Sequence, residues 1–270
     1  MPKTTLEQGY GGRDFNRGPT TYSDPEFYRK ILSATGLRHA IDSKRVLDIM
    51  SGPGKVGQAL QKLAPENNYF YLDLSETQVR KIPPVVNDLK HYRVNADVRA
   101  LPIGDSAIDV AVVRYGIKDL IQEEQLGVLK DIYRILRPGG TLVIADMVSP
   151  DADGVKEWLN NHHALKQELG GRDPEKEGAC YIPTRKEWLS MLSDAGFRFE
   201  MLETHVSHVI TKSWVDGNQI TEEQLAGMND NIRGGSDEVK REFSVREENG
   251  LVKIDYPVII IKAIKPDQGD

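Results

Sequence analysis

The stretch Asp48-Ile-Met-Ser-Gly52-Pro-Gly54-Lys-Val-Gly57 decides the fold of this chain. It lies where a short apolar run, residues 46–50, gives way to apolar residues at helical spacing. This change of period predicts a strand, a glycine-rich turn and then a helix. Because glycine has no side chain, the backbone of such a turn can approach a ligand closely. A ligand site is therefore expected at the end of the first strand.

The remaining sequence alternates short apolar runs with helical stretches, which is the pattern of a parallel sheet covered by helices. After residues 46–50, further strands are expected at residues 69–73, 92–95, 108–113, 141–145, 197–204 and 258–261. The expected fold class is α/β, with a seven-stranded, mostly parallel sheet and helices on both faces.

One domain with insertions is expected from the length of 270 residues. Residues 1–43 are interpreted as an N-terminal arm and lid helix, and residues 44–270 as the ligand-binding domain. Helical patterns at about 150–180 and 211–250 interrupt the alternation of strands and helices. These two insertions are expected to form a small helical cap over the site.

The composition excludes several classes of protein. A net charge of −6 without a block of Lys and Arg disfavours a nucleic-acid partner. The single cysteine, Cys180, forms no internal disulfide, and no apolar run reaches membrane-spanning length. A cytoplasmic protein without a membrane partner is expected, and the sequence is compatible with a monomer or a homodimer.

Two cofactor classes are open at the glycine-rich turn. Gly52 to Gly57 fit the spacing G-x-G-x-x-G, in which a helix N-terminus faces the pyrophosphate of a dinucleotide. Asp48, however, would repel a pyrophosphate and attract the ammonium and sulfonium charges of S-adenosylmethionine (SAM). The carboxylate therefore favours SAM over NAD.

Several motifs in order resemble those of the class I SAM-dependent methyltransferases of the type 11-like group. They are the first motif DIMSGPGKVG, YLDLS at 71–75, NADV at 95–98, IDVAVVRYGI at 108–117 and LRPGGTLVIADMV at 136–148. The resemblance covers roughly residues 44–200 and extends to about 265. It implies a Rossmann-like fold, SAM as cofactor, S-adenosylhomocysteine as product, and a small-molecule acceptor methylated at C, O or N.

Within that family, RYGIKDL at 114–120 is similar to the matching stretch of the ubiquinone/menaquinone-biosynthesis C-methyltransferases. The chain lacks their histidine- and arginine-rich N-terminal signature, and its insertion at Thr211–Gly250 is not theirs. A quinone acceptor is therefore not expected.

The resemblance also implies roles for single residues. Asp73 is expected to accept hydrogen bonds from both ribose hydroxyls, and Asp97 from the adenine amino group. NAD enzymes place an acid like Asp73 there too, so it supports a nucleoside ligand without choosing the cofactor. The expected cofactor-binding residues are Asp48, Ser51, Gly52, Gly54, Asp73, Leu74, Asp97, Val98 and Arg114.

Methyl transfer is an in-line displacement that depends mainly on alignment, so a general base is optional. His163, on the first insertion, is the candidate base, and Arg114 and Tyr115 at the end of the fourth strand are the other candidate catalytic residues. Aromatic candidates for contact with the acceptor are Tyr10, Tyr22 and Tyr181. No metal site is expected, because the Asp151–Gly154 stretch lacks the spacing of a calcium loop.

Three other functions are weighed against small-molecule methyl transfer. An NAD(P)-dependent oxidoreductase would use Gly52–Gly57 and Asp73 but leaves Asp48 and Asp97 without roles. A SAM-binding protein without methyl transfer is open, because fold does not fix function. A methyltransferase acting on RNA or protein is disfavoured by the acidic charge balance.

Overall fold

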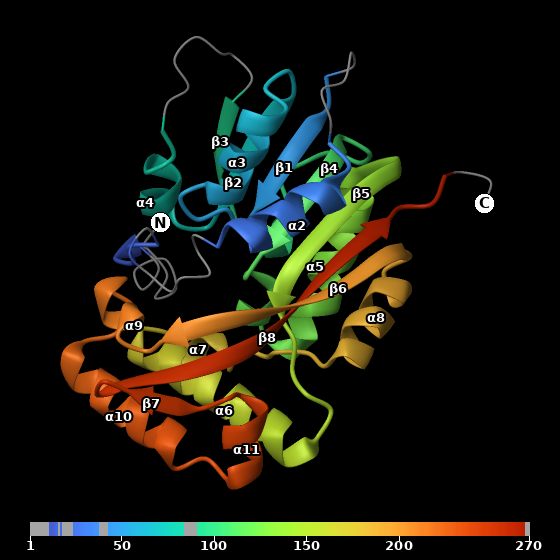
Figure 1. Ribbon diagram of the computed structural model, residues 1–270. Helices are drawn as coiled ribbons and strands as arrows, with labels where there is room; N and C mark the ends of the chain where they lie inside the picture. The colour runs from blue at the N-terminus through green and yellow to red at the C-terminus, as the bar shows by residue number, and fades with distance from the viewer. Residues whose placement is uncertain (1–10, 16, 18–23, 38–42, 84–90, 268–270) are drawn as a thin grey trace.

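The computed structural model describes residues 11–15, 17, 24–37, 43–83 and 91–267, and its first half is a series of parallel strands linked by helices (Figure 1). The strands are β1 (Arg45–Ile49), β2 (Asn68–Asp73), β3 (His91–Asn95), β4 (Ile108–Arg114) and β5 (Leu136–Met147). The connecting helices are α3 (Lys55–Leu63), α4 (Glu76–Arg80), η2 (Val98–Ala100), η3 (Ile117–Asp119) and α5 (Gln122–Ile135).

The sheet has the order β3-β2-β1-β4-β5-β8-β6, with β7 paired to β8. Strands β6 (Arg198–Ile210) and β8 (Leu251–Ile264) pair antiparallel with each other, and β8 is also antiparallel to β5. The predicted α/β class with a mostly parallel sheet is confirmed.

Among the described residues the sheet has eight strands rather than the predicted seven, because a short strand was missed. β7 (Arg246–Glu248) is three polar residues long and forms a hairpin with the start of β8. Its turn is Asn249-Gly250, where both residues have positive φ, 53° and 74°. This pair is the usual sequence of a two-residue hairpin turn.

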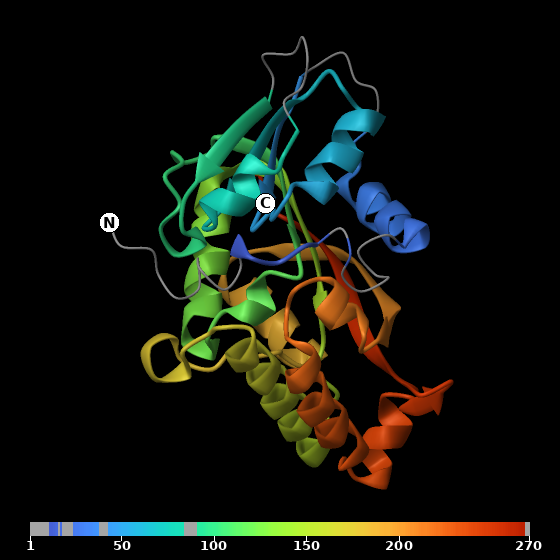
Figure 2. The same ribbon diagram turned by 90° about the vertical axis from the view of Figure 1, so that its left-hand side faces the viewer.

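Helices cover both faces of the sheet, as Figure 2 shows for α3 and α5 on opposite sides. Along β4 the side chains alternate, so that Val110 and Val112 face one core and Ala111 and Val113 face the other. The first core is covered by α2 (Pro25–Thr35), α3 and α4, and the second by α5 and α8 (Arg185–Asp194).

Helix α2 packs on the sheet through Phe27 and Ile31, which are fully buried in the first core. The lid role expected for this helix stays a prediction. In the part of the chain that the structure describes, no helix has the length and hydrophobicity that a bilayer span requires.

The two insertions pack together into one helical layer beside the extended ends of β6 and β8 (Figure 1). We call this layer the cap: α6 (Asp153–Leu169), α9 (Ser213–Asp216), α10 (Glu222–Arg233) and α11 (Asp237–Glu242), while the short α7 (Pro174–Glu177) follows α6 on the first insertion. Its own core includes Leu159, Trp214, Met228, Phe243 and Tyr256. The cap is therefore a packed unit and not a pair of loose loops.

The contact between α3 and β2 requires glycine. An ideal Cβ built on Gly57 would lie 2.3 Å from Cε1 of the Tyr71 ring and 3.1 Å from Oδ2 of Asp48. Tyr71 is fully buried, so its ring has no room to move away. Gly127, in the middle of α5, has no atom within 4 Å of such a Cβ.

We predict opposite effects of alanine at these two helical glycines. Gly57→Ala is expected to lower the free energy of unfolding by roughly 1–3 kcal/mol, because the overpacking of Tyr71 outweighs the gain in helix propensity. Gly127→Ala is expected to raise it by up to about 1 kcal/mol. Urea unfolding of both variants tests this, and equal stability of the two would contradict the close packing of α3 on β2.

Candidate functional site

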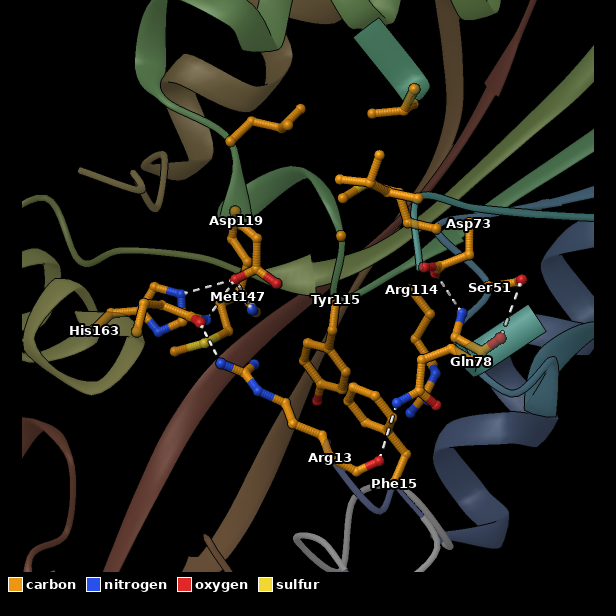
Figure 3. Close-up of a pocket in the computed structure, with 18 of the residues that line it drawn as sticks. Arg13, Phe15, Ser51, Asp73, Gln78, Arg114, Tyr115, Asp119, Met147 and His163 are labelled. Carbon is orange, nitrogen blue, oxygen red and sulfur yellow. Dashed lines mark hydrogen bonds and ion pairs between the residues drawn. The ribbon is translucent and has the colours of Figure 1, made fainter. Parts of the chain in front are cut away.

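A cavity lies where the carboxyl ends of the parallel strands meet the cap (Figure 3). Its wall combines residues that follow β1, β2 and β4 with residues of α6 and of the second insertion. In Figure 3, Asp73 and Ser51 lie on one side, Asp119 and His163 on the other, and Tyr115 between them. The site is thus built between sheet and cap, at the edge where open α/β sheets bind ligands.

Asp48 is buried at the end of β1 and holds the first turn of α3. Its Oδ2 accepts the Gly57 N–H at 2.8 Å, and the side chain is only 3% exposed. Burial raises the pKa of Asp48 to about 7, although the Gly57 N–H and the charge of Arg114 act to lower it. A cationic ligand group in this cavity would favour the ionised carboxylate and lower that pKa.

Asp73, at the end of β2, hydrogen-bonds to the turn after β1 and to the turn after β2. Its Oδ2 accepts the Gly52 N–H at 2.7 Å and its Oδ1 accepts the Ser75 N–H at 2.8 Å. Gly52 has a φ of 54°, a conformation in which glycine is favoured. Burial raises the pKa of Asp73. Each carboxylate oxygen retains a second lone pair for a ligand donor.

Asp97 lies at the start of η2 and is bound to Arg99. The Arg99 Nη2 approaches Asp97 Oδ2 at 2.6 Å, and the Arg99 main-chain N–H donates to Asp97 Oδ1 at 2.9 Å. Burial acts to raise the pKa of Asp97, but the hydrogen bonds and charge of Arg99 prevail and hold it below its usual value. Leu74 and Val98 line the same part of the cavity.

Two non-glycine residues with left-handed backbones stand beside the cavity. Met50 follows β1 with a φ of 52°, and Tyr115 follows β4 with a φ of 53°. Such conformations carry a cost of order 1–3 kcal/mol and concentrate at functional sites. Arg114 and Tyr115 are in contact, with the guanidinium carbon 5.5 Å from the ring centre.

A buried network around Asp119, which the sequence did not single out, joins the end of β4 to the cap. Asp119 Oδ1 lies 2.6 Å from Lys118 Nζ, 3.1 Å from His163 Nε2 and 2.9 Å from Gln167 Nε2. Burial acts to raise the pKa of Asp119, yet Lys118 and His163 prevail and lower it. Burial and the Lys118 charge lower the pKa of His163. The pair is therefore an ionised carboxylate beside a neutral imidazole.

The segment 11–15 crosses from the sheet side of the cavity to the cap. The carbonyl oxygen of Arg13 accepts from Gln78 Nε2 at 3.0 Å, and that of Phe15 from Lys55 Nζ at 2.7 Å. On the cap side, Arg13 Nη2 donates to Gln167 Oε1 at 2.9 Å. The N-terminal segment thereby contributes Arg13 and Phe15 to the wall of the cavity (Figure 3).

The structure brings most of the predicted site residues together. The cavity is lined by Asp48, Ser51, Gly52, Asp73, Leu74, Asp97, Val98, Arg114, Tyr115 and His163. Gly54 stands behind the wall, where its ideal Cβ would meet the Tyr71 ring at 2.9 Å. It serves the packing of α3 on β2.

Of the three tyrosines expected to contact the acceptor, Tyr181 is the one that the structure describes. Tyr181 is half-buried, donates its hydroxyl to Glu187 Oε1 at 2.8 Å, and is not part of the cavity wall. Tyr10 and Tyr22 lie outside the described residues. Over those described residues, no group of three or more His, Cys, Asp or Glu side chains is arranged to hold a metal.

Comparison with known proteins decides the family. A family model described as a methyltransferase domain matches residues 46–140, from β1 to the start of β5. The ubiquinone/menaquinone biosynthesis C-methyltransferase of Yersinia enterocolitica is 25% identical over 185 residues, which cover 63% of this chain and 71% of that protein. The chain is a class I SAM-dependent methyltransferase.

Solved structures share the fold of this methyltransferase. The YcgJ protein of Bacillus subtilis superposes with a TM-score of 0.77 at 16% identity, covering 91% of this chain and all of the other. A geranyl diphosphate methyltransferase solved with SAM gives a TM-score of 0.57 at 13% identity, covering 88% and 84%. At these identities the likeness concerns the fold alone.

The residues of the cavity fit SAM, the cofactor of this family. Burial raises the pKa of the Asp48 carboxylate, and the ammonium and sulfonium groups of the cofactor would favour its ionised form. Asp73 offers two oxygens to a vicinal diol. A dinucleotide would instead place its pyrophosphate against the Asp48 carboxylate.

In this methyltransferase the cap also holds a buried histidine that gives a pH-dependent stability. His162 stacks on Trp158 with ring centres 4.8 Å apart and hydrogen-bonds to Asn231 Oδ1 at 2.7 Å and to the Tyr256 hydroxyl at 2.9 Å. Burial lowers its pKa from 6.5 to about 4. Between these values the unfolded chain binds a proton that the folded chain does not, so stability falls as pH falls.

We predict that His162→Gln removes this acid-sensitive contribution. From pH 7 to pH 5 the wild type should lose about 2 kcal/mol more unfolding free energy than the variant. Urea unfolding of both proteins at the two pH values gives the difference, in which the contributions of all other groups cancel. An equal loss in wild type and variant would show that His162 is not kept neutral in the folded cap.

Proposed function

We propose that this methyltransferase transfers the methyl group of SAM to a small-molecule acceptor held between the strand ends and the cap. The observation that carries the proposal is one continuous cavity with two chemically different ends. One end offers Asp48 and Asp73 from the sheet, and the other offers Trp214 and Tyr256 from the cap and β8. The cavity can therefore hold a cofactor and an acceptor side by side.

At the sheet end we assign the cofactor contacts to the residues that follow the strands. Asp73 accepts from the two ribose hydroxyls, Asp97 from the adenine amino group, and Asp48 faces the cationic part of the molecule. Bound SAM supplies an electrophilic methyl group on a sulfonium. The remaining contacts are assigned to Ser51, Gly52, Leu74, Val98 and Arg114, while Gly54 supports the turn from behind.

Tyr115 and Arg114 stand between the two ends and are assigned the alignment of the acceptor with the cofactor. The left-handed backbone of Tyr115 directs its side chain away from the line of β4. A small displacement of either residue would change the approach of the two substrates. We expect this alignment to supply most of the rate enhancement.

His163 is assigned as the group that takes up a proton where the acceptor releases one. Asp119 lies 3.1 Å from His163 Nε2 and orients the ring when that nitrogen carries the proton. Nδ1 is then the acceptor nitrogen of a neutral imidazole. A carbon, oxygen or nitrogen acceptor is compatible with this arrangement.

Three observations support a small molecule as the acceptor. The cavity is bounded by the cap and by the segment 11–15, and the net charge of −6 disfavours nucleic acid. Among the relatives and neighbours, some are named for ubiquinone/menaquinone biosynthesis, one for geranyl diphosphate and one for sarcosine and dimethylglycine, which are all small molecules. We do not propose a quinone as the acceptor, because the cavity is also lined by residues of the insertion at 211–250 and by several cationic side chains.

The cofactor assignment predicts a selective loss of affinity in Asp73→Asn. The variant keeps the shape of the side chain but loses the carboxylate charge, so the ribose hydrogen bonds weaken by about 2 kcal/mol. Asp109→Asn is the matched control. Asp109 lies on β4 outside the cavity wall and forms ion pairs with Arg45 and Arg137.

Equilibrium dialysis with labelled S-adenosylhomocysteine measures both variants. The expected result is weaker binding by Asp73→Asn and wild-type binding by Asp109→Asn. Equal affinity of Asp73→Asn and wild type would remove Asp73 from the ribose contact.

A further inference from the structure

The cap end of the cavity carries an excess of positive charge. Four cationic side chains line it, and two acidic ones do so beside them: Arg13, Lys118, Lys166 and Arg172 against Asp119 and Glu177. Asp119 is already engaged by Lys118. The Arg172 guanidinium donates to three main-chain oxygens, including that of Asp119 at 2.5 Å. The excess charge is therefore left facing the space where the acceptor binds.

Lys166 has no acidic partner within ion-pair distance among the described residues. It lies on α6, one turn after His163, and its Nζ is 4.8 Å from the centre of the Trp214 ring. No carboxylate of the described chain comes within 4.0 Å of that nitrogen. Burial and the charges of Arg13 and Lys118 lower the pKa of Lys166 to about 7, while Asp119 acts in the opposite direction.

Gln219 supplies a second, independent sign of a ligand at the same place. The residue is 5% exposed, lines the cavity, and its buried Nε2 has no hydrogen-bond partner in the described structure. A buried amide donor without a partner costs about 1–3 kcal/mol, so such groups normally find one. A ligand oxygen in the cavity would be that partner.

Three segments that are distant in the sequence meet at Gly170, through the side chain of Arg13 and the main chain at Lys166 and Gln219. An ideal Cβ on Gly170 would lie 2.6 Å from Arg13 Nη2, 3.0 Å from the Gln219 main-chain oxygen and 3.3 Å from that of Lys166. A side chain at this position would crowd the Arg13 guanidinium and the main chain of Gln219. The N-terminal segment and the two insertions thus converge on one corner of the cavity.

We propose that this corner binds a carboxylate of the methyl acceptor, with the Lys166 ammonium and the Gln219 amide as its donors. The inference rests on the proposed function and narrows its substrate class to small molecules with an acidic group. Trp214, beside Lys166, packs against the apolar part of the acceptor. One ammonium and one amide donor suit a planar, singly charged carboxylate. Arg13 is not counted among the donors, because its Nη2 already donates to Gln167 Oε1.

The inference is tested by acetylation of Lys166 with acetic anhydride at pH 7, followed by peptide mass spectrometry. Benzoate is the probe, and benzamide is its uncharged counterpart. As benzoate is titrated, the labelling rate of Lys166 should fall, to about a tenth once most of the protein is bound. Benzamide should leave it unchanged, and the exposed Lys186 on α8 should react equally in all samples.

Several results would overturn the proposal. One is that benzoate and benzamide lower the labelling rate of Lys166 equally, and another is that neither lowers it. A third is that benzoate protects Lys186 as much as it protects Lys166. Protection by phenyl phosphate but not by benzoate would also overturn it, since the site would then be one for phosphate.

A pair of variants links the protection to Gln219. Gln219→Glu places a negative charge at the corner and should abolish protection by benzoate. Asn249→Asp adds the same charge on the same insertion, in the exposed β7–β8 turn outside the cavity wall, and should keep it, because Asp-Gly also fits a hairpin turn. Both variants must bind S-adenosylhomocysteine like the wild type, which shows that they are folded.

S-adenosylhomocysteine binding also separates the two proposals. If the wild type binds it and benzoate gives no protection, the acceptor inference fails and the proposed function stands. If it does not bind, the proposed function fails whatever the labelling of Lys166.

Discussion

Two hydrogen bonds that carboxylates accept from the glycine-rich turn after β1 are the constraint on which the site depends. Asp48 accepts from Gly57 and so fixes the start of α3, while Asp73 accepts from Gly52 and so fixes the turn itself. Both acids are held near the cavity at the cost of burial, which raises the pKa of each. A cationic nucleoside such as SAM relieves this cost, because it brings charge and hydroxyl donors to the same two groups.

The cap and the N-terminal segment form the part of the cavity wall that the sheet does not provide. The sheet provides an acidic end that is set by strand order, and the cap provides a cationic and aromatic end that is set by the insertions. Asp119 connects the two, since it follows β4 and contacts His163 and Gln167 of α6. The same fold can thus keep one cofactor site while the insertions determine the acceptor.

The sequence predicted the parts of the molecule that depend on local pattern. The strands of the parallel sheet were found from apolar runs, and motifs that each follow a strand singled out residues that line the sheet end of the cavity. β7 was missed because its three residues are polar, although Asn249-Gly250 is a hairpin signal.

The cap end was not predictable in the same way. Lys166 and Gln219 are ordinary polar residues in the sequence, and they acquire a role only where separate segments meet around Gly170. Tyr181 is the opposite case, a residue that the sequence singled out for a ligand contact. In the structure its hydroxyl donates to Glu187.

The central claim is that the acidic end of the cavity binds SAM, and calorimetric titration of the wild-type protein tests it most directly. S-adenosylmethionine, S-adenosylhomocysteine and NADH are titrated in parallel under the same conditions. The account predicts saturable binding of the first two and no binding of NADH, because Asp48 attracts a sulfonium and repels a pyrophosphate. Binding of NADH alone would contradict it and assign the turn after β1 to a dinucleotide.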